Sequence, residues 1–429
     1  MYIDESSERE IALTPSTLFT DAAASAAPPV VAPESKCLPD TPEATFTRLA
    51  KAAKACDLPT PCYLLDHSAF QRNGRILKDV QDRTGAHILL AQKAFACFNL
   101  YPTLRNYLAG TTASGLHEAR LGAEEFGGEV HVFSPAYTPA EMTELVKISD
   151  HIVFNSLSQW SRYREEVLSA DRKVSPGLRI NPEYAESVAE IYNPCGHGSR
   201  FGVLASKLEG ADLDGIEGLH FHTLCEQGSD ALERTLEHVT AKFDSYLKKM
   251  KWLNMGGGHL ITTPGYDIER LVRIIGELQA RYPQLTIYLE PGEAISTGTG
   301  VLVGSVIDLV ENGMDVAVLD VSATAHMPDV LEMPYRAGLE NSGEAGEKKH
   351  TYRLGAPTCL SGDVIGDYSF DEPLQIGDQV VFHDMAHYTM VKNTTFNGVR
   401  LPDIAILKED GKIETVRQFT YEDYKMRLG

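Results

Sequence analysis

Short apolar or β-branched runs recur along the chain between residues 87 and 290 and alternate with helix-like segments such as Pro139–Ile148 and Asp267–Arg281. The eight runs are 87–92, 110–114, 129–134, 151–155, 177–181, 218–223, 252–256 and 286–290. Strands that alternate with helices pair in parallel, and eight such units predict an α/β fold built on a TIM-like (β/α)8 barrel, residues 69–295. A doubly wound sheet is the alternative.

The pattern changes after about residue 296, where strand-like runs are joined by turns rather than by helices. These runs are Val301–Val310, Val316–Val321, Tyr352–Leu354, Gln379–His383 and the region of Tyr388. They predict a C-terminal β-sandwich or β-barrel domain formed by residues 296–429 together with residues 46–68, which contain an early strand at Cys62–Asp66.

The first 45 residues include an Ala/Pro-biased stretch without amphipathic period, and we expect them to form a disordered extension. The chain has 429 residues, a formal net charge of −21 and seven cysteines without a CxxC pair. The acidic balance argues against nucleic acid or an anionic membrane as partner. The cysteines indicate reduced thiols and no metal site of the zinc type, and no signal peptide or membrane span is apparent, so we expect a soluble cytoplasmic protein.

Lys93 closes the first of the barrel runs, His87 to Lys93. In a (β/α)8 barrel the chemistry lies at the C-terminal ends of the strands. Burial at a strand end lowers the pKa of an ammonium group, and the neutral amine is the form that attacks an aldehyde to make a Schiff base. A strand-end lysine that merely reaches solvent would look the same, so Lys93 alone does not decide between the two interpretations.

Gly256, Gly257 and Gly258 end the seventh run, and Glu290 ends the eighth. Residues without a Cβ let backbone N–H groups close around an anion, and phosphate commonly binds after strands seven and eight of a barrel. Together with Lys93, this arrangement predicts pyridoxal 5'-phosphate as the cofactor. Glu290 would then keep the pyridine nitrogen protonated, which makes the ring a strong electron sink.

His222 and Cys359 are weaker candidates. His222 ends the sixth run and is placed to stack on the cofactor ring, although a lone histidine is more often a hydrogen-bonded core residue. Cys359 lies among turn-forming residues between Gly355 and Asp363. Its thiol is a candidate proton donor, and a small buried hydrophobe is an equally good interpretation.

Five longer segments of the chain combine these residues with their neighbours. They are Tyr192–Val203, Gly218–Glu226, Leu253–His259, Leu289–Ala294 and His383–Tyr388. Together they resemble the alanine-racemase-fold (fold type III) pyridoxal-phosphate decarboxylases, the group of ornithine and diaminopimelate decarboxylases. Within that group they are most similar to the carboxynorspermidine/carboxyspermidine decarboxylases, over roughly residues 57–405.

The resemblance implies a role for each residue around the cofactor ring. Lys93 would hold the cofactor through a Schiff base and His222 would stack on its ring. Glu290 would pair with the ring nitrogen, and Arg179 would lie near the phenolic oxygen. The phosphate would be bound by Gly256, Gly257, Gly258, Tyr388 and Cys225.

The resemblance also implies a homodimer with active sites at the subunit interface, because the proton donor, Cys359, comes from the partner subunit in such decarboxylases. The chain departs from the wider group at Glu293, where ornithine and diaminopimelate decarboxylases have Glu-Pro-Gly-Arg. A glutamate suits a substrate ammonium better than a substrate carboxylate. Asp329 matches a substrate-amine acid of the family, and we also assign Asp363 to substrate binding.

The expected function is therefore pyridoxal-phosphate-dependent decarboxylation of carboxynorspermidine and/or carboxyspermidine, a small cationic polyamine-type substrate, in polyamine synthesis. One alternative is a decarboxylase of a smaller diamino acid, of the ornithine or diaminopimelate type, which Glu293 disfavours. A racemase on the same fold would need a weakly polarised ring, which Glu290 disfavours. A catalytically inactive, partner-binding homologue would be expected to lack Lys93 or Cys359, and both are present.

Overall fold

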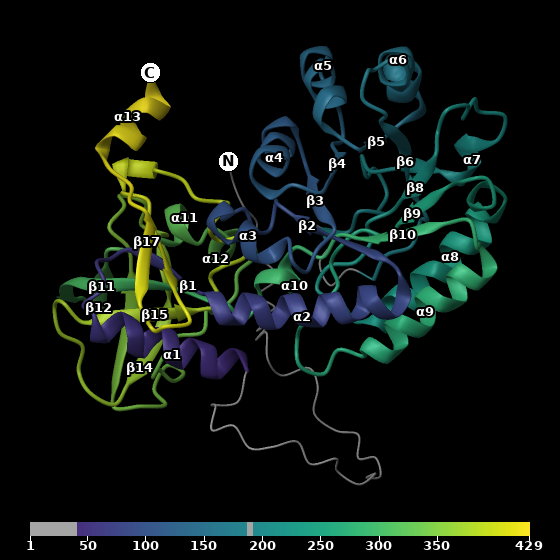
Figure 1. Ribbon diagram of the computed structural model, residues 1–429. Helices are drawn as coiled ribbons and strands as arrows, with labels where there is room; N and C mark the ends of the chain where they lie inside the picture. Colours follow the sequence, from purple (N-terminus) through teal and green to yellow (C-terminus); the bar gives the residue numbers. More distant parts are fainter. Residues whose placement is uncertain (1–40, 187–191) are drawn as a thin grey trace, which may run out of the picture.

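The computed structural model of the chain describes residues 41–186 and 192–429, which form a barrel and a second sheet (Figure 1). Parallel strands pair in the order β5-β4-β3-β2-β10-β9-β8-β6, and β5 also pairs with β6, so that the sheet closes. The (β/α)8 barrel is confirmed and the doubly wound sheet is excluded. The barrel strands are β2 (His87–Ala91), β3 (Gly110–Ala113), β4 (Glu129–Phe133), β5 (His151–Phe154), β6 (Ser175–Asn181), β8 (Gly218–His220), β9 (Trp252–Asn254) and β10 (Thr286–Leu289).

All of these strands except β6 begin at the first residue of the expected apolar run, and they end before the polar residues that close it. A short β7 (Val203–Leu204) pairs in parallel with the end of β6. Helices surround the barrel: α2 (His67–Thr84), α3 (Tyr101–Leu104), α4 (Leu116–Leu121), α5 (Pro139–Ile148), α6 (Leu157–Leu168), α7 (Ala205–Leu208), α8 (Ser229–Leu247), α9 (Ile268–Arg281) and α10 (Glu293–Ser296). Among the described residues, no helix combines the length and the apolar composition needed to cross a bilayer.

Helix α5 shows how local sequence sets these boundaries. Thr138 caps its N-terminus in a capping box, accepting from the Glu141 backbone N–H while the Glu141 carboxylate accepts from that of Thr138. Pro139 follows at the first helical position, where it has no hydrogen bond to lose. Helix α4 is followed directly by a π-helix over Gly122–Phe126.

The second sheet is mostly C-terminal, but it includes the early strand β1 (Cys62–Asp66). β1 pairs antiparallel with β11 and parallel with β16. The other strands of this sheet are β11 (Gly300–Glu311), β12 (Asp315–Leu319), β13 (His350–Gly355), β14 (Val364–Phe370), β15 (Gln379–His383), β16 (Asp403–Leu407) and β17 (Ile413–Arg417), and its helices are α1 (Pro42–Ala55), α11 (Ala323–His326), α12 (Asp329–Glu332) and α13 (Tyr421–Leu428).

Two expected segments, the strand around Tyr388 and the N-terminal extension, are compared with the structure in turn. The strand expected around Tyr388 is wrong: this residue lies in a loop after β15 and has a positive φ of +44°, which an extended strand does not accommodate. The expected N-terminal extension lies outside the described residues up to position 40. Its last residues, from Pro42, already belong to helix α1, which Thr41 caps by accepting from the Ala44 backbone N–H.

The barrel interior is filled rather than hollow. A central apolar layer is formed by Leu89, Val153, Trp252 and Tyr288. The Trp252 ring fits because β6 and β8 present glycines to it: a Cβ on Gly177 or Gly218 would lie 2.2 Å or 1.9 Å from the ring. This layer separates two polar ends of the barrel, as in other barrels whose interiors are stacked layers of side chains.

Candidate active site

Lys93 lies just past the C-terminal end of β2, in a tight turn closed by the hydrogen bond from the Ala94 N–H to the Ala91 carbonyl at 3.0 Å. Its side chain is accessible at the open end of the barrel, but protein surrounds the opening. This burial lowers the pKa of the Lys93 amine, against the opposing effect of the nearby Glu290 carboxylate. The amine is thus accessible to a solute and easier to deprotonate than a surface lysine.

Glu290, which follows β10, is held at both carboxylate oxygens. Oε1 accepts hydrogen bonds from Asn254 Nδ2 at 2.7 Å and Thr112 Oγ1 at 3.0 Å, and Oε2 lies 3.3 Å from His220 Nε2. Burial alone would raise the pKa of Glu290, but His220 and the hydrogen bond from Asn254 outweigh it and lower that pKa below its usual range. Glu290 is therefore a fixed carboxylate that can hold a protonated nitrogen.

His220 and Asn254 were not identified as site residues from the sequence. His220 alternates with His222 along the same strand end, and Asn254 immediately precedes the Met255-Gly256 turn. Both side chains point into the barrel because residues of a strand alternate between its two faces. Once Glu290 had been placed at the end of β10, this alternation could have identified Asn254 on the adjacent β9 and His220 on β8, the next strand.

His222 lies beside the glycine turn. The backbone N–H of Gly257 donates to His222 Nδ1 at 2.9 Å, so the neutral ring carries its proton on Nε2. Burial, followed by the charges of Lys93 and Arg179, lowers the pKa of His222 well below its usual value. The ring is therefore neutral, which is the form that packs against an aromatic ring without burying a charge.

Arg179, on β6, is almost fully buried and sits between two aromatic rings. Its guanidinium carbon lies 4.5 Å from the Phe133 ring centroid and 4.4 Å from that of Phe201. It donates a hydrogen bond to the His222 carbonyl at 3.1 Å. Burial lowers its pKa to about 10, so the guanidinium remains charged at neutral pH and can bind an anionic oxygen.

The glycine turn approaches the neighbouring strand ends too closely for side chains. Gly256 and Gly258 have φ values of +72° and +81°, which favour glycine. A Cβ on Gly257 would lie 2.2 Å from the Glu290 carbonyl oxygen. The N–H groups of Gly256 and Gly257 already donate to Asn254 Oδ1 and His222 Nδ1, so the expectation that this turn binds a phosphate stays a prediction.

A group of acidic and aromatic residues from three loops lies near these glycines. Burial raises the pKa of Glu293 to about 7, with Glu226 and Asp384 adding to the shift and His387 opposing it. The charges of Asp384 and Glu293 outweigh burial and raise the pKa of His387 to about 9. Tyr388 is next to His387, and Glu293 is among the groups that raise the pKa of its phenol. We call Glu226, Glu293 and Asp384 the acidic group.

Cys225, on the loop after β8, is half-buried beside the acidic group. Burial, together with Glu226 and Glu293, raises the pKa of its thiol to about 11, so the thiol is neutral at physiological pH. A neutral thiol can donate a hydrogen bond to a phosphate oxygen. The contribution of Cys225 and Tyr388 to phosphate binding stays a prediction.

Asp329, at the start of α12, forms an ion pair with Lys392, and Lys392 also contacts Glu332 at 2.5 Å. A lysine therefore already occupies a place where a substrate ammonium was expected. Because Lys392 has a second carboxylate partner, the Asp329 carboxylate can exchange this lysine for a ligand without leaving Lys392 unpaired. The role of Asp329 stays a prediction.

Cys359 is exposed on the loop between β13 and β14, where its backbone N–H donates to Asn397 Oδ1 at 3.2 Å. Asp363, at the end of this loop, is buried. Its oxygens accept hydrogen bonds from Ser322 Oγ at 2.6 Å and from the Thr324 N–H at 3.0 Å. Asp363 therefore anchors the Cys359 loop to α11, and the substrate-binding role assigned to it stays a prediction.

Comparisons with known proteins show which family the chain resembles. A family model described as pyridoxal-dependent decarboxylase, C-terminal sheet domain, matches residues 55–386. A carboxyaminopropylagmatine decarboxylase of Synechocystis sp. is 49% identical over 373 residues, covering 87% of this chain and 96% of the relative. A carboxynorspermidine/carboxyspermidine decarboxylase of Campylobacter jejuni is 43% identical over 381 residues, covering 86% and 98%. The crystal structure of carboxynorspermidine decarboxylase from Campylobacter jejuni, complexed with norspermidine, superposes with a TM-score of 0.81 at 42% identity, covering 86% of this chain and 100% of that one.

Proposed function

This chain belongs to the family of pyridoxal-dependent decarboxylases, and on that basis we propose that it decarboxylates a carboxylated polyamine. The proposed substrates are carboxynorspermidine and/or carboxyspermidine, and the products are norspermidine or spermidine. The observation that carries the proposal is the position of the acidic group beside a Lys93–Glu290 site. Lys93 and Glu290 suit an aldehyde cofactor, and the acidic group suits a substrate with several ammonium groups.

The residues of the barrel mouth fit pyridoxal phosphate. Bound there, the cofactor supplies an electron sink for the electron pair that CO2 leaves behind. Lys93 would bind its aldehyde carbon, and Glu290 would hold the proton on its ring nitrogen. The neutral His222 ring would pack against it and Arg179 would bind its phenolic oxygen. Gly256, Gly257 and Gly258 would surround the phosphate.

Protonation of the carbon that has lost CO2 requires a donor, and Cys359 Sγ is the proposed one. Glu290, Arg179, Glu118 and Cys225 are among the groups that act on the Lys93 amine within its own chain. Cys359 is exposed instead, next to Leu360, which is 44% exposed, and in contact with the loop of Phe396, which is 43% exposed. An exposed thiol among exposed apolar side chains supports a homodimer in which Cys359 of the partner subunit completes each site.

The acidic group supports the choice of substrate. A carboxylated triamine brings ammonium groups into the pocket along with its carboxylate, and carboxylates bind ammonium through charge-assisted hydrogen bonds. Glu293 stands where ornithine and diaminopimelate decarboxylases have an arginine. An arginine at that position would repel a distal ammonium.

A second candidate is carboxyaminopropylagmatine, because the Synechocystis relative that decarboxylates it is 49% identical to this chain. Agmatine ends in a guanidinium rather than an ammonium. A planar guanidinium binds a carboxylate with two parallel hydrogen bonds, and the acidic group offers carboxylates to either cation.

CO2 release by the purified protein, loaded with pyridoxal phosphate, tests the proposal. The substrates to compare are carboxynorspermidine, carboxyspermidine, carboxyaminopropylagmatine, ornithine and diaminopimelate. A hydrogen bond to a charged group contributes about 1.5–3 kcal/mol, so loss of the distal cation should lower kcat/KM about ten- to a hundredfold. One of the carboxylated polyamines should therefore exceed ornithine by that factor. A higher kcat/KM for ornithine or diaminopimelate would contradict the proposal.

A further inference from the structure

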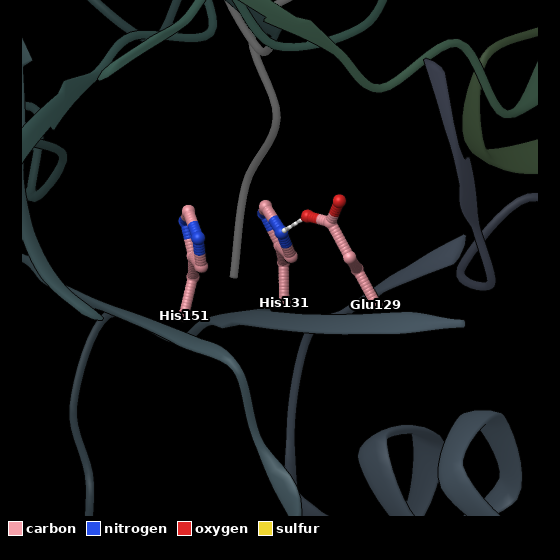
Figure 2. A group of neighbouring side chains, drawn as sticks. All are labelled: Glu129, His131 and His151. Carbon is pink, nitrogen blue, oxygen red and sulfur yellow. Dashed lines mark hydrogen bonds and ion pairs between the residues drawn. The ribbon is translucent and has the colours of Figure 1, made fainter. Parts of the chain in front are cut away.

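The N-terminal end of the barrel, opposite Lys93, contains a second polar cluster. Glu129 and His131 lie two residues apart on β4, and His151 begins the adjacent β5, where it pairs in register with His131. Their side chains rise side by side from the two strands toward the barrel interior (Figure 2). The apolar layer of the barrel separates them from the cofactor end.

The three side chains bring donor atoms close together. One oxygen or nitrogen from each of Glu129, His131 and His151 lies within 4.8 Å of the other two. Glu129 Oε2 and His131 Nε2 are 2.9 Å apart, and the rings of His131 and His151 stack with centroids 3.9 Å apart at 14°. Two imidazoles and a carboxylate form a donor set typical of zinc and other first-row transition metals.

Two of these nitrogens are buried without a partner. Nδ1 of His131 and Nδ1 of His151 make no hydrogen bond within the described part of the chain, and the residues are 1% and 9% exposed. A buried polar atom left unsatisfied carries a desolvation cost, and two such atoms side by side favour a bound ligand. A cation is the ligand that nitrogen lone pairs and a carboxylate both bind.

The surroundings support coordination rather than mere packing. His87 Nδ1 lies 2.9 Å from Glu129 Oε1, so the second carboxylate oxygen is already oriented by a histidine. Metal-binding carboxylates and imidazoles are commonly held by such outer hydrogen bonds. Tyr288 packs against both imidazoles, with ring centroids 4.8 Å from His131 and 5.3 Å from His151, and its phenol interacts with the Glu129 carboxylate.

We propose that Glu129, His131 and His151 form a binding site for a divalent transition-metal ion, Zn²⁺ by its donor set, at the N-terminal end of the barrel. The stacked rings direct their nitrogens nearly parallel, so one imidazole must turn about its Cβ–Cγ bond until both nitrogens lie about 2.0–2.1 Å from the ion. That torsion is broad for histidine. Water fills the fourth position of a tetrahedral site with three protein ligands.

This site was not expected from the sequence, which indicated no zinc site because the cysteines lack metal-ligand spacing. The ligands here are separated by a whole β-α unit. Glu129-Val130-His131 is a common strand pattern in which polar residues alternate with apolar ones. Only the in-register pairing of His131 with His151 brings the second histidine to the first.

Calorimetric titration of the chelator-treated, dialysed holoenzyme with ZnCl2 tests the site. We expect wild-type protein to bind one ion per chain at this cluster. His151→Phe keeps an aromatic ring against His131 and Trp252 but removes the nitrogens, and it should weaken this binding by more than about a hundredfold, the upper end of the loss seen for outer-shell changes. Glu129→Gln, which keeps a hydrogen-bond acceptor, should also weaken it.

The matched control is His238→Phe. His238 on α8 stacks on Tyr184 at 4.0 Å and 11°, so the same substitution is made at another ring-stacked histidine, and binding should be unchanged. Zn²⁺ bound by cysteines elsewhere would persist in His151→Phe. Loss of binding in His151→Phe but not in His238→Phe therefore excludes binding by cysteines.

A spectroscopic measurement checks the position of the ion. The Trp252 ring lies 4.8 Å from that of His151, so Co²⁺ should quench tryptophan fluorescence in wild-type protein and in His238→Phe but not in His151→Phe. Intact cofactor absorbance and an unchanged thermal unfolding transition would show that each variant is folded. If His151→Phe does not fold, Glu129→Gln takes its place in the comparison. Absence of binding in wild-type protein, or wild-type affinity in both His151→Phe and Glu129→Gln, would overturn the proposal.

Discussion

The backbone N–H of Tyr388 donates a hydrogen bond to the carbonyl oxygen of Ala94 at 2.8 Å, one residue beyond Lys93. This bond joins the loop after β15 directly to the turn that carries the lysine. Tyr388 has a φ of +44°, a conformation that non-glycine residues seldom adopt and that the surrounding structure must maintain. A loop of the C-terminal sheet domain therefore contacts the turn that carries Lys93.

Gly257→Ala should weaken cofactor binding. Its Cβ would lie 2.2 Å from the Glu290 carbonyl oxygen, so the turn has to move. Overpacking of this kind costs about 1–3 kcal/mol, which corresponds to a loss of about five- to a hundredfold in affinity for pyridoxal phosphate. Titration of the apoprotein with pyridoxal phosphate, monitored through the cofactor absorbance, measures this affinity. Gly276→Ala on α9, where a new Cβ meets no atom within 4 Å, is the matched control and should bind the cofactor normally. Equal affinity in the two variants would show that the turn does not bind the phosphate.

Glu293→Gln and Asp329→Asn should each lower kcat/KM on carboxylated polyamines. Each removes one charge-assisted hydrogen bond of about 1.5–3 kcal/mol, a factor of about ten to a hundred. Cofactor absorbance should not change, because neither residue is assigned a cofactor contact. Glu332→Gln, which removes the other partner of Lys392, is the control for indirect effects at Asp329. Wild-type kcat/KM in both variants would leave the polyamine preference without a physical basis.

Binding of a cationic substrate should strengthen as pH rises through neutrality. The pKa of Glu293 is raised to about 7 by burial, so its carboxylate is largely protonated below that pH and anionic above it. Polyamine ammonium groups stay protonated in this range, since an unperturbed amine of the lysine type has a pKa of about 10. KM should therefore fall from about pH 6 to about pH 8. In Glu293→Gln this part of the fall should disappear, and an unchanged KM profile would mean that another group controls substrate affinity.

Mixing inactive Lys93→Ala and Cys359→Ala proteins should restore activity if the thiol acts across the dimer. Random exchange makes half of the dimers mixed, and each mixed dimer has one complete site of two, so about a quarter of wild-type activity should return. Mass spectrometry of differently tagged subunits confirms the exchange. No recovery after confirmed exchange would show that the Cys359 thiol acts within its own chain or takes no part in the reaction.

The barrel could be predicted from the sequence because each strand is a short apolar run that ends at a polar or glycine residue. The same ends carry Lys93, Glu290 and the glycine turn, so strand order in a closed barrel already places them together. Asn254 on β9 and His220 on β8 were missed because their function depends on the order of the strands next to β10. That pairing follows from barrel closure but is not encoded in either residue's own surroundings.

The other errors arise from contacts between residues that are distant in sequence. Apolar residues around Tyr388 resemble a strand, but the positive φ of the loop is set by its contact with Ala94, which is distant in sequence. The sequence offered no sign that Lys392 would pair with Asp329, because the two residues lie on different segments and meet only when the C-terminal sheet folds. Periodicity and motif spacing do not predict tertiary contacts of this kind.

Reduction of the holoenzyme with borohydride and peptide mapping provide the most direct measurement of the proposed chemistry. Lys93 bears the cofactor in this proposal, so the reduced cofactor should be found on the peptide that contains Lys93. Lys93→Ala should lack the visible absorbance of the lysine-bound cofactor and release no CO2 from a carboxylated polyamine. A cofactor mapped to another lysine, or a Lys93→Ala protein that keeps both the absorbance and CO2 release, would contradict it.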